Sequence, residues 1–584
     1  MKGTPGLWLV MLALPGWLCG GCRTAEKTML CVSRLKSPVT VATPGLNKPF
    51  TPAELEQAQI DRATLKPSEG PAPALVNPNA SPPLARANQA RLDAGADLRQ
   101  KDRLVIVCLS GGGARAARMA AHTLACLEQK YNRQYSTAAA NHPLAGQIDA
   151  WSSISGGSLY ASFVARQLLR DQGARTNTFA LLVSQGRARW GTQGLGGMAA
   201  LYYLWPGNLG YGPLMQFFTD WDTLDLFVHT LALCHEGGFP FLPSPRMSKL
   251  GELPLRPRFF FNATCRETSR PFIFTQSVVH RDLSGDPLAR LTQDPLLRWI
   301  QGQPTPPNEL NEPFRYASTL EDLGSPPNRF PLAYAAMASA AFPGIFEPLR
   351  LHRYWLATNA AAGPSGHPKP WRLRTEVTLA DGGLYDNTGL TTALEFFDYL
   401  GRASTRPKKL VLLAIDANNQ PEGYTGARAP SRSPIHYGLP FRAAAAAVAT
   451  VGKMYNSQQA LVAAAINHRL EALEQAGRLE TCHLRLKDAL KLIPTANDVS
   501  MRAKLRRLRE RAVKQPWSQI QALSFFGLVQ DIPTDFVLSN QEDEDLRGIV
   551  ERLLEWKPQA NAPSLAERFL RAVADASPEC AQPN

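Results

Sequence analysis

The stretch Leu104-Val-Ile-Val-Cys-Leu109 runs directly into Ser110-Gly-Gly-Gly-Ala-Arg115, and an alanine-rich segment follows as far as Lys130. The first six residues are continuously apolar and β-prone, which is typical of a strand buried on both faces of a sheet. The glycines indicate a tight turn, and the segment after them is predicted to be a helix. This order predicts an α/β protein with a parallel central sheet flanked by helices.

Further strands are predicted from similar apolar runs. One run ends near Ser153 and passes into a helix that reaches Leu169. Three more lie at 258–262, 376–380 and 410–415. Because strands that are apolar on both faces alternate with helical segments, we expect helices to cover both sides of the sheet.

The chain divides into four regions. Residues 1–21 are predicted to be a signal peptide, and 22–100 a proline-rich linker that follows a possible lipid anchor. Residues 101–425 hold the predicted α/β catalytic domain, and 426–584 a helical region that packs on it or extends it. Within that last region, residues 501–514 form either a helix with a solvated basic face or a helix that lies on a membrane surface.

The first residues favour export. Lys2 precedes an apolar run from Leu7 to Leu18, which is shorter than the roughly 20 residues that span a bilayer. Cys19-Gly-Gly-Cys22 is similar to a bacterial lipoprotein cleavage box, which would leave Cys22 as the lipid-bearing first residue. We therefore expect an exported, membrane-anchored lipoprotein of the bacterial cell envelope, which would lie in the outer membrane if the cell is Gram-negative. An ordinary cleaved signal and an uncleaved tether are the alternatives.

Composition limits the partners. A hydrophobic content of 44% excludes a disordered protein. The 63 basic and 49 acidic residues give a net charge of +14, which favours anionic partners such as phospholipid headgroups or nucleic acid. Only this charge supports nucleic acid, so we do not predict a nucleic-acid partner. The chain lacks paired CxxC motifs and HExxH, so no metal and no other cofactor are predicted.

The glycine-rich loop is the first segment that could carry chemistry. Gly111, Gly112 and Gly113 precede a predicted helix, and Arg115 follows them. Unshielded N–H groups at a helix N-terminus favour negative charge, so the loop could bind a phosphate or a developing oxyanion. It lacks GxGxxG spacing and the GK[ST] ending of a P-loop, which disfavours nucleotide binding. The alternative is a plain tight turn.

The second segment surrounds Ser155, between a predicted strand and a helix. A nucleophile elbow needs small residues two positions before and two after its serine. Ser153 and Gly157 meet this requirement, and Gly156 adds freedom at the turn. Ser153 replaces the usual first glycine. The alternative is a serine- and glycine-rich loop.

The third segment begins at Asp381, which closes a predicted strand and precedes two glycines. Open α/β sheets place functional groups at the carboxyl ends of their strands. The alternative is a common Asp-Gly turn. Asp386 competes for a catalytic role, although its position after the turn favours a structural hydrogen bond.

In this order the three segments resemble the patatin-like phospholipases. The loop and the Ser-Gly pair also resemble the cytosolic phospholipase catalytic domain. Weaker similarities are Asn262–Thr264, Ala338–Gly344 and Ile532–Phe536. The resemblance implies a serine lipid acyl hydrolase with Ser155 as nucleophile, Asp381 as general base, and an oxyanion hole at Gly111 to Gly113 with Arg115. It also implies a lipid ester or phospholipid substrate at a membrane surface.

Two alternatives remain open. An α/β-hydrolase would use Asp381 to orient a catalytic histidine, and His436, His468 and His483 are the candidates. A non-catalytic envelope lipoprotein would bind lipid through aromatic segments such as 201–205 and 217–221. The oligomeric state is not predicted.

Overall fold

The computed structural model of the chain describes its central α/β region and parts of the C-terminal region. The described residues are 49, 98, 101–135, 142–189, 228, 231, 245–250, 253, 257–276, 317–343, 348–356, 371–402, 408–418, 459–491, 540–557 and 561–576. The predicted signal peptide, Cys22, nearly all of the linker and the basic segment 501–514 lie outside these residues.

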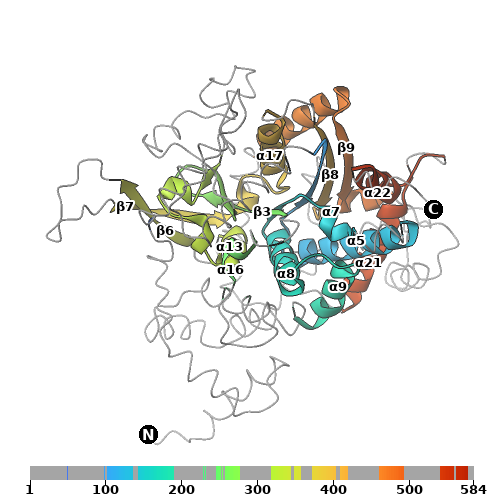
Figure 1. Ribbon diagram of the computed structural model, residues 1–584, viewed down its shortest axis with the longest axis horizontal. Helices are drawn as coiled ribbons and strands as arrows, with labels where there is room; N and C mark the ends of the chain where they lie inside the picture. Colours follow the sequence, from blue (N-terminus) through green and yellow to red (C-terminus); the bar gives the residue numbers. More distant parts are fainter. Residues whose placement is uncertain are drawn as a thin grey trace, which may run out of the picture.

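In the described part of the chain, nine strands form one sheet in the order β5-β4-β3-β2-β1-β8-β9, and β7 joins β6 to the edge of β3 (Figure 1). The strands are β1 (Arg103–Leu109), β2 (Ala150–Ile154), β3 (Arg258–Cys265), β4 (Arg270–Thr275), β5 (Ser318–Thr319), β6 (Leu349–Leu356), β7 (Trp371–Asp381), β8 (Lys409–Asp416) and β9 (Leu479–Arg485).

The centre of the sheet is parallel, as predicted, and its margin is mixed. Strands β3, β2, β1, β8 and β9 pair in parallel. Antiparallel pairs join β3 to β4, β3 to β7, and β6 to β7. The prediction of a parallel sheet is therefore correct for the core, and the observed fold is a mixed, mostly parallel sheet flanked by helices.

Helices cover both faces of the sheet. They are α5 (Gly113–Gln134), α7 (Leu144–Gln147), α8 (Gly156–Asp171), α9 (Thr178–Arg189), α13 (Met247–Leu250), α16 (Leu332–Ser339), α17 (Leu390–Arg402), α21 (Asn540–Glu555) and α22 (Leu565–Ala576). Residues 459–475 are also helical.

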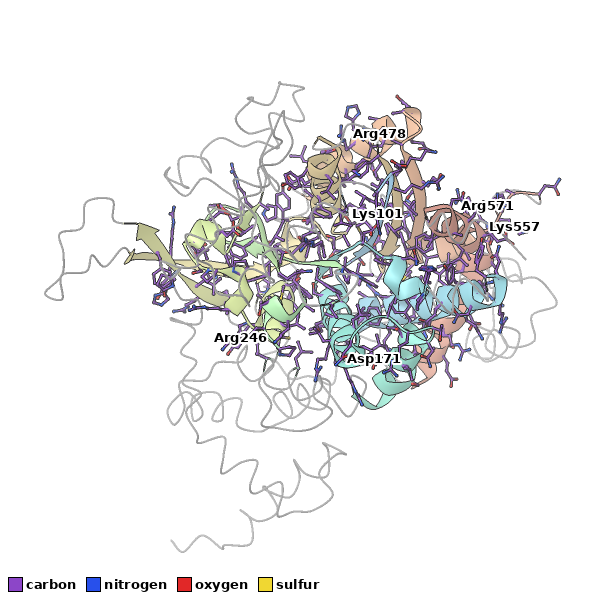
Figure 2. The ribbon with its side chains drawn as sticks, in the orientation of Figure 1. Lys101, Asp171, Arg246, Arg478, Lys557 and Arg571 are labelled. Carbon is purple, nitrogen blue, oxygen red and sulfur yellow. The ribbon has the colours of Figure 1, made fainter. Side chains whose placement is uncertain are left out.

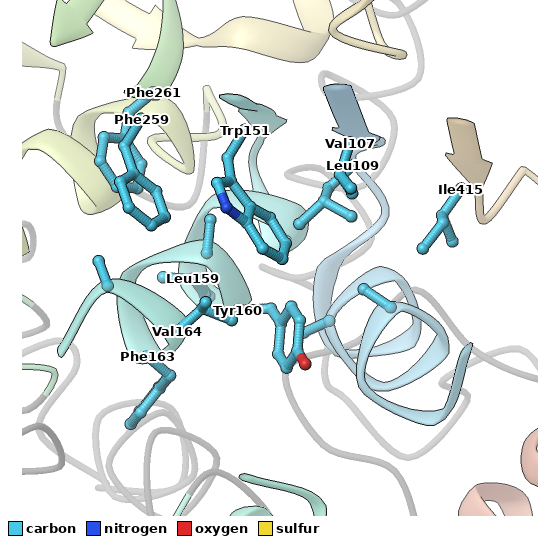
Figure 3. Close-up of a cluster of buried hydrophobic side chains, with 14 of the residues drawn as sticks. Val107, Leu109, Trp151, Leu159, Tyr160, Phe163, Val164, Phe259, Phe261 and Ile415 are labelled. Carbon is cyan, nitrogen blue, oxygen red and sulfur yellow. The ribbon is translucent and has the colours of Figure 1, made fainter. Parts of the chain in front are cut away.

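Alternate side chains of β1 enter two different apolar clusters. Val105, Val107 and Leu109 pack with α5, α8, α21 and α22. Leu104, Ile106 and Cys108 pack with α17 and the helix at 459–475. Successive side chains of a strand point to opposite faces, so a continuously apolar strand needs an apolar layer on each side. Figure 3 shows the first cluster, in which Trp151 and Phe259 stack with ring centroids 5.9 Å apart.

The C-terminal region completes this sheet. Strand β9 extends it beyond β8, and the sequence analysis did not predict this strand. Its side chains alternate between buried and partly buried positions, which is a weaker signal than a continuous apolar run. Arg478, at the upper part of Figure 2, donates from Nε to the Lys408 carbonyl (3.1 Å) and lies 5.3 Å from the Phe397 ring centroid.

Helix α21 is held on α5 by a buried charged cluster. Arg118 donates from Nε and Nη2 to the two carboxylate oxygens of Asp543, each at 2.6 Å, and His122 Nε2 lies 2.8 Å from Asp543 Oδ1. The C-terminal helices therefore belong to the same core as the first strand. None of the helices in the described ranges combines the length and the apolar character needed to cross a membrane.

Candidate active site

Ser155 lies at a sharp turn between β2 and α8. Its backbone has φ 51° and ψ −121°, a conformation that a non-glycine residue rarely adopts. Such a conformation costs of order 1–3 kcal/mol and persists only where the surrounding structure imposes it. The sequence motif predicted a turn between strand and helix here, and the structure has such a turn with a strained backbone at Ser155.

Close backbone packing explains the glycines after Ser155. A Cβ atom at Gly156 would overlap the carbonyl group of Gly113. At Gly157 it would lie 2.7 Å from both Leu109 Cβ and the Ser110 carbonyl oxygen. The first turn of α8 therefore packs directly against the glycine-rich loop, which brings that loop next to Ser155.

Ser153 occupies the position where a glycine is usual, and its hydroxyl both donates and accepts a hydrogen bond. It donates to the Phe260 carbonyl of β3 (3.1 Å) and accepts from Ser158 Oγ (3.0 Å). Its side chain is buried. The elbow therefore accommodates a serine here because the added hydroxyl has buried partners.

Strand β3 brings Asp381 to Ser155. The first five residues of β3 pair with β2, and its last three pair with β7. Strand β4 pairs across both sets and occupies the other side, so β2 and β7 lie on one side of β3. The end of β2, Ile154, is opposite Asn262, and the end of β7, Asp381, is opposite the next residue, Ala263. Ser155 and Asp381 therefore meet where the two strands end.

The carboxyl group of Asp381 is buried and hydrogen-bonded. Its Oδ1 accepts from the Gly383 N–H (2.7 Å), and its carboxyl also forms a hydrogen bond with the Ser155 side chain. Burial raises the pKa of Asp381 to about 6, although both hydrogen bonds act to lower it. A carboxylate with this pKa, in contact with a serine hydroxyl, can accept its proton near neutral pH.

The glycine-rich loop lies beside this pair. Gly112 has φ 130°, a backbone conformation that favours glycine. Ser110 anchors the loop to β8, since its N–H donates to the Ile415 carbonyl (3.0 Å) and its Oγ accepts from the Ala417 N–H (2.8 Å). A Cβ at Gly111 would lie 3.3 Å from Ser155 Cβ.

Arg115 lies in the first turn of α5, the helix that follows the loop. Its side chain is buried, and a Cβ at Gly112 would lie 3.8 Å from its Nη2. Its charge also acts on Asp416, at the end of β8. Burial raises the pKa of Asp416, and Arg115 is one of the groups that oppose this change. Arg115 thus adds positive charge beside the loop while part of that charge is balanced by Asp416.

Asn387, which the sequence analysis did not single out, joins the loop to the segment after Asp381. Its backbone carbonyl accepts from the Gly111 N–H (3.0 Å). Its side-chain oxygen occupies the space that a Cβ would need at both Gly111 and Gly383. The two glycine motifs are therefore packed together through one side chain.

Asn262 and Ser339 were also missed as site residues, although both lie in segments with weak family similarity. Asn262 Nδ2 donates to the Ser153 carbonyl (3.0 Å) and to Ser152 Oγ (3.1 Å). Ser339 Oγ accepts from the Ser155 N–H (3.1 Å). Both side chains therefore form hydrogen bonds with the backbone of the elbow.

The other acidic candidate has a structural position. Asp386 accepts from the N–H and hydroxyl of Thr388 (2.8 and 2.6 Å) and from the Thr391 N–H (2.9 Å), at the start of α17. These contacts agree with the structural hydrogen bond expected for Asp386.

Of the candidate histidines, the structure describes His468 and His483, and His483 lies apart from Ser155. His483 is on β9, and β1 and β8 separate that strand from β2. Three strand spacings correspond to about 14 Å. His468 is exposed on the helix at 459–475, and His436 lies outside the described residues. Within the described residues, no group of three or more His, Cys, Asp or Glu side chains could hold a metal ion.

Comparisons with known proteins give one family match and one similar solved structure. Residues 107–394 match the model of the family described as patatin-like phospholipase. No curated protein matches the chain. Among solved structures, human GIVD cytosolic phospholipase A2 is similar at 12% identity with a TM-score of 0.35, and the alignment covers 84% of this chain and 64% of that one.

Proposed function

We propose that the protein is a serine lipid acyl hydrolase of phospholipase or lysophospholipase type, because residues 107–394 match the model of the patatin-like phospholipase family. In this proposal Ser155 is the nucleophile and Asp381 its general base. The observation that carries the proposal is the direct hydrogen bond between the Ser155 side chain, on a strained turn, and the buried carboxyl of Asp381. An acidic residue that contacts the serine itself supports a dyad in which no imidazole lies between the two side chains.

The reaction would proceed in two steps. Asp381 takes the Ser155 hydroxyl proton while Oγ attacks the ester carbonyl carbon, which gives a tetrahedral intermediate. The carbon–oxygen bond to the alcohol then breaks, and the alcohol leaves with the proton from Asp381. In the second step Asp381 takes a proton from water, and the hydroxide attacks the acyl-enzyme. The fatty acid leaves as Ser155 recovers its proton.

The glycine-rich loop would stabilise the negative charge on the carbonyl oxygen. In this proposal the donors are backbone N–H groups around Gly112 and Gly113, because the loop passes close to Ser155 at Gly111, and the buried Arg115 adds positive charge. One donor of this kind typically lowers the barrier by about 2.7–4 kcal/mol. The chemistry of this scheme uses only side-chain and backbone groups of the chain.

We also propose that the enzyme is exported and held at a membrane through a lipid on Cys22. The short apolar run and the small residues before Cys22 support this location, and the net charge of +14 suits an anionic lipid surface. Incorporation of radiolabelled palmitate by the wild type but not by Cys22→Ser tests the anchor. An unlabelled wild-type chain would contradict it.

Covalent labelling tests the catalytic proposal. A fluorophosphonate should label the wild type at Ser155 and should leave Ser155→Ala unlabelled. Both Ser155→Ala and Asp381→Asn should lose turnover of phospholipids, lysophospholipids and glycerides by a factor of about 10³ or more. Asp386→Asn is the matched control, because it changes a neighbouring carboxylate with only structural contacts.

The same measurements separate the alternatives. A non-catalytic lipid-binding protein would show no labelling and no turnover. A triad enzyme would lose activity when its catalytic histidine is replaced, so replacements of His436, His468 and His483 should each retain activity. EDTA should have no effect on turnover, and a strong loss would contradict a mechanism without metal.

A further inference from the structure

Three buried serine hydroxyls form a connected group below the elbow. Ser153 Oγ donates to the Phe260 carbonyl (3.1 Å), Ser158 Oγ lies 3.0 Å from Ser153 Oγ and 2.8 Å from Ser339 Oγ, and Ser339 Oγ donates to the Asn262 carbonyl (2.5 Å). The side chains come from β2, α8 and the last residue of α16, and all are at most 1% exposed. We call Ser153, Ser158 and Ser339 the serine cluster.

The three serines have fewer hydroxyl hydrogens than they have hydrogen-bond contacts. Three hydroxyl hydrogens serve four oxygen–oxygen contacts. Because Ser153 and Ser339 use their hydrogens on the carbonyls of β3, the one hydrogen of Ser158 is shared between its two serine neighbours. The serine cluster therefore links the elbow to β3 through two hydrogen bonds, one from Ser153 to Phe260 and one from Ser339 to Asn262.

Ser339 makes one further contact, and this contact involves the nucleophile. The backbone N–H of Ser155 donates to Ser339 Oγ (3.1 Å). This N–H belongs to the peptide that precedes the strained φ of 51°. The direction of the N–H sets the orientation of that peptide plane, and the orientation of the plane sets where Ser155 Oγ points.

The geometry points to Ser339 as a positioning residue, which holds the Ser155 backbone in the conformation that aims Oγ at Asp381. Ser158 and Ser153 orient the Ser339 hydroxyl and secure it to β2. This inference rests on the proposed function, since it assigns Ser339 a role in the reaction of Ser155. It also explains why a serine replaces glycine at position 153, where the side-chain hydroxyl completes the serine cluster.

Helix α8 supplies a matched control. Ser162 lies one turn after Ser158 and is equally buried, but its hydroxyl donates to the Leu159 carbonyl of its own helix (2.7 Å). Ser162→Ala and Ser339→Ala each remove one buried hydroxyl. A purely structural role for Ser339 would therefore leave both variants with similar kcat, whatever their unfolding temperatures.

Steady-state kinetics with a short-chain p-nitrophenyl ester tests the kinetic part. Ser339→Ala should lower kcat about 10- to 100-fold with little change in KM, because the nucleophile is misdirected while the substrate site is intact. Ser158→Ala should have a smaller effect, since Ser339 keeps its contacts with Ser155 and Asn262. Ser162→Ala should retain wild-type kcat.

Hydrogen–deuterium exchange followed by mass spectrometry tests the backbone part without using activity. Peptides that contain Ser155 should exchange faster in Ser339→Ala than in Ser162→Ala. Faster exchange together with a reduced kcat supports the inference. Unchanged exchange, or a kcat equal to that of Ser162→Ala, overturns it. Full turnover by Ser155→Ala would overturn the proposed function instead, and the exchange result would still decide whether Ser339 anchors the turn.

Discussion

Ser155 and Asp381 are far apart in the sequence, yet their side chains share a hydrogen bond because β2 and β7 end at adjacent residues of β3. The two strands reach this junction from opposite directions, since β2 is parallel to β3 and β7 is antiparallel to it. A shift of β7 by one residue would turn the Asp381 side chain to the other face of the sheet. The geometry of the pair therefore depends on backbone register.

The pH dependence of the reaction should follow Asp381. Burial raises its pKa to about 6, and the base must be ionised to accept the serine proton. We expect kcat/KM to increase with pH through about 6 and to level off above it, which a pH–rate profile of the free enzyme measures. Asp381→Asn should show no such inflection. An inflection close to the ordinary pKa of aspartate, about 3.9, would contradict a buried base.

Gly156→Ala should inactivate the protein through the loop. The added Cβ would overlap the Gly113 carbonyl, so the loop or the helix must move. We expect a loss of activity of at least about 100-fold, because the proposed oxyanion donors of the loop would be displaced.

Gly548→Ala is the control for this substitution. Gly548 lies within α21, and a Cβ there would meet nothing within 4 Å. This change should leave activity intact and stabilise the fold by about 0.5–1 kcal/mol, which thermal unfolding measures. Wild-type activity in Gly156→Ala would show that the close approach is not required.

Sequence patterns predicted those parts of the fold that depend on local chemistry. The apolar run from Leu104 to Leu109 predicted a central strand, and the glycine-rich turns after it were placed correctly between strand and helix. Strand β9 was missed because one of its faces is only partly buried and its residues alternate in polarity. The antiparallel pairing of β7 with β3 was also missed, since pairing between distant segments leaves no periodic signal.

The candidate site likewise contains some residues that local sequence motifs predicted and others that they did not. Ser155, Asp381 and the Gly111–Gly113 loop lie in short motifs whose spacing reflects local backbone geometry. Asn387 and Ser339 act through contacts with segments distant in sequence, and their neighbours along the chain do not identify these partners. Ser339 could have been noticed only through the weak similarity of its segment, Ala338 to Gly344.

The buried contact between α5 and α21 should be important for stability. Burial acts to raise the pKa of Asp543, but hydrogen bonds and charges from His122 and Arg118 outweigh it and hold that pKa below its ordinary value. Asp543→Ala leaves the Arg118 charge buried without this carboxylate and should cost about 3–5 kcal/mol in the free energy of unfolding.

Acid should weaken the same contact. A lowered pKa in the folded state contributes stability above the ordinary pKa, and this stability is lost as the pH falls toward the folded value. The wild type should lose stability below about pH 4, and Asp543→Ala should lose less over the same range. Asp575→Asn is the control, since its pair with Arg103 is longer (3.7 Å) and half exposed. An equal effect of the two substitutions would contradict this prediction.

Glu128 should give the opposite pH dependence. It accepts hydrogen bonds from the Phe179 and Ala180 N–H groups at the start of α9 (2.9–3.1 Å). Burial raises its pKa to about 7, although these bonds act to lower it. The folded state thus binds more protons than the unfolded state between about pH 4.5 and 7, so stability should fall as the pH rises through this window.

Glu128→Gln should reduce that decline. The unfolding temperatures of wild type and variant, measured from pH 4.5 to 7, should show a steeper fall for the wild type. Asp381 contributes a decline of the same sign below pH 6, so the difference between the two curves is the relevant quantity. Parallel curves would mean that Glu128 titrates near its ordinary pKa.

The pairing of β1 with β8 and of β8 with β9 also bears on when the sheet can be completed during synthesis. Strand β1 can pair with β8 only after the ribosome has made residues 409–416. The hydrogen bond from Arg118 of α5 to Asp543 forms only after α21 has been made. Contacts of such long sequence separation form slowly and late. A growing chain that already contains Ser155 and Asp381 therefore still lacks the finished sheet that supports them.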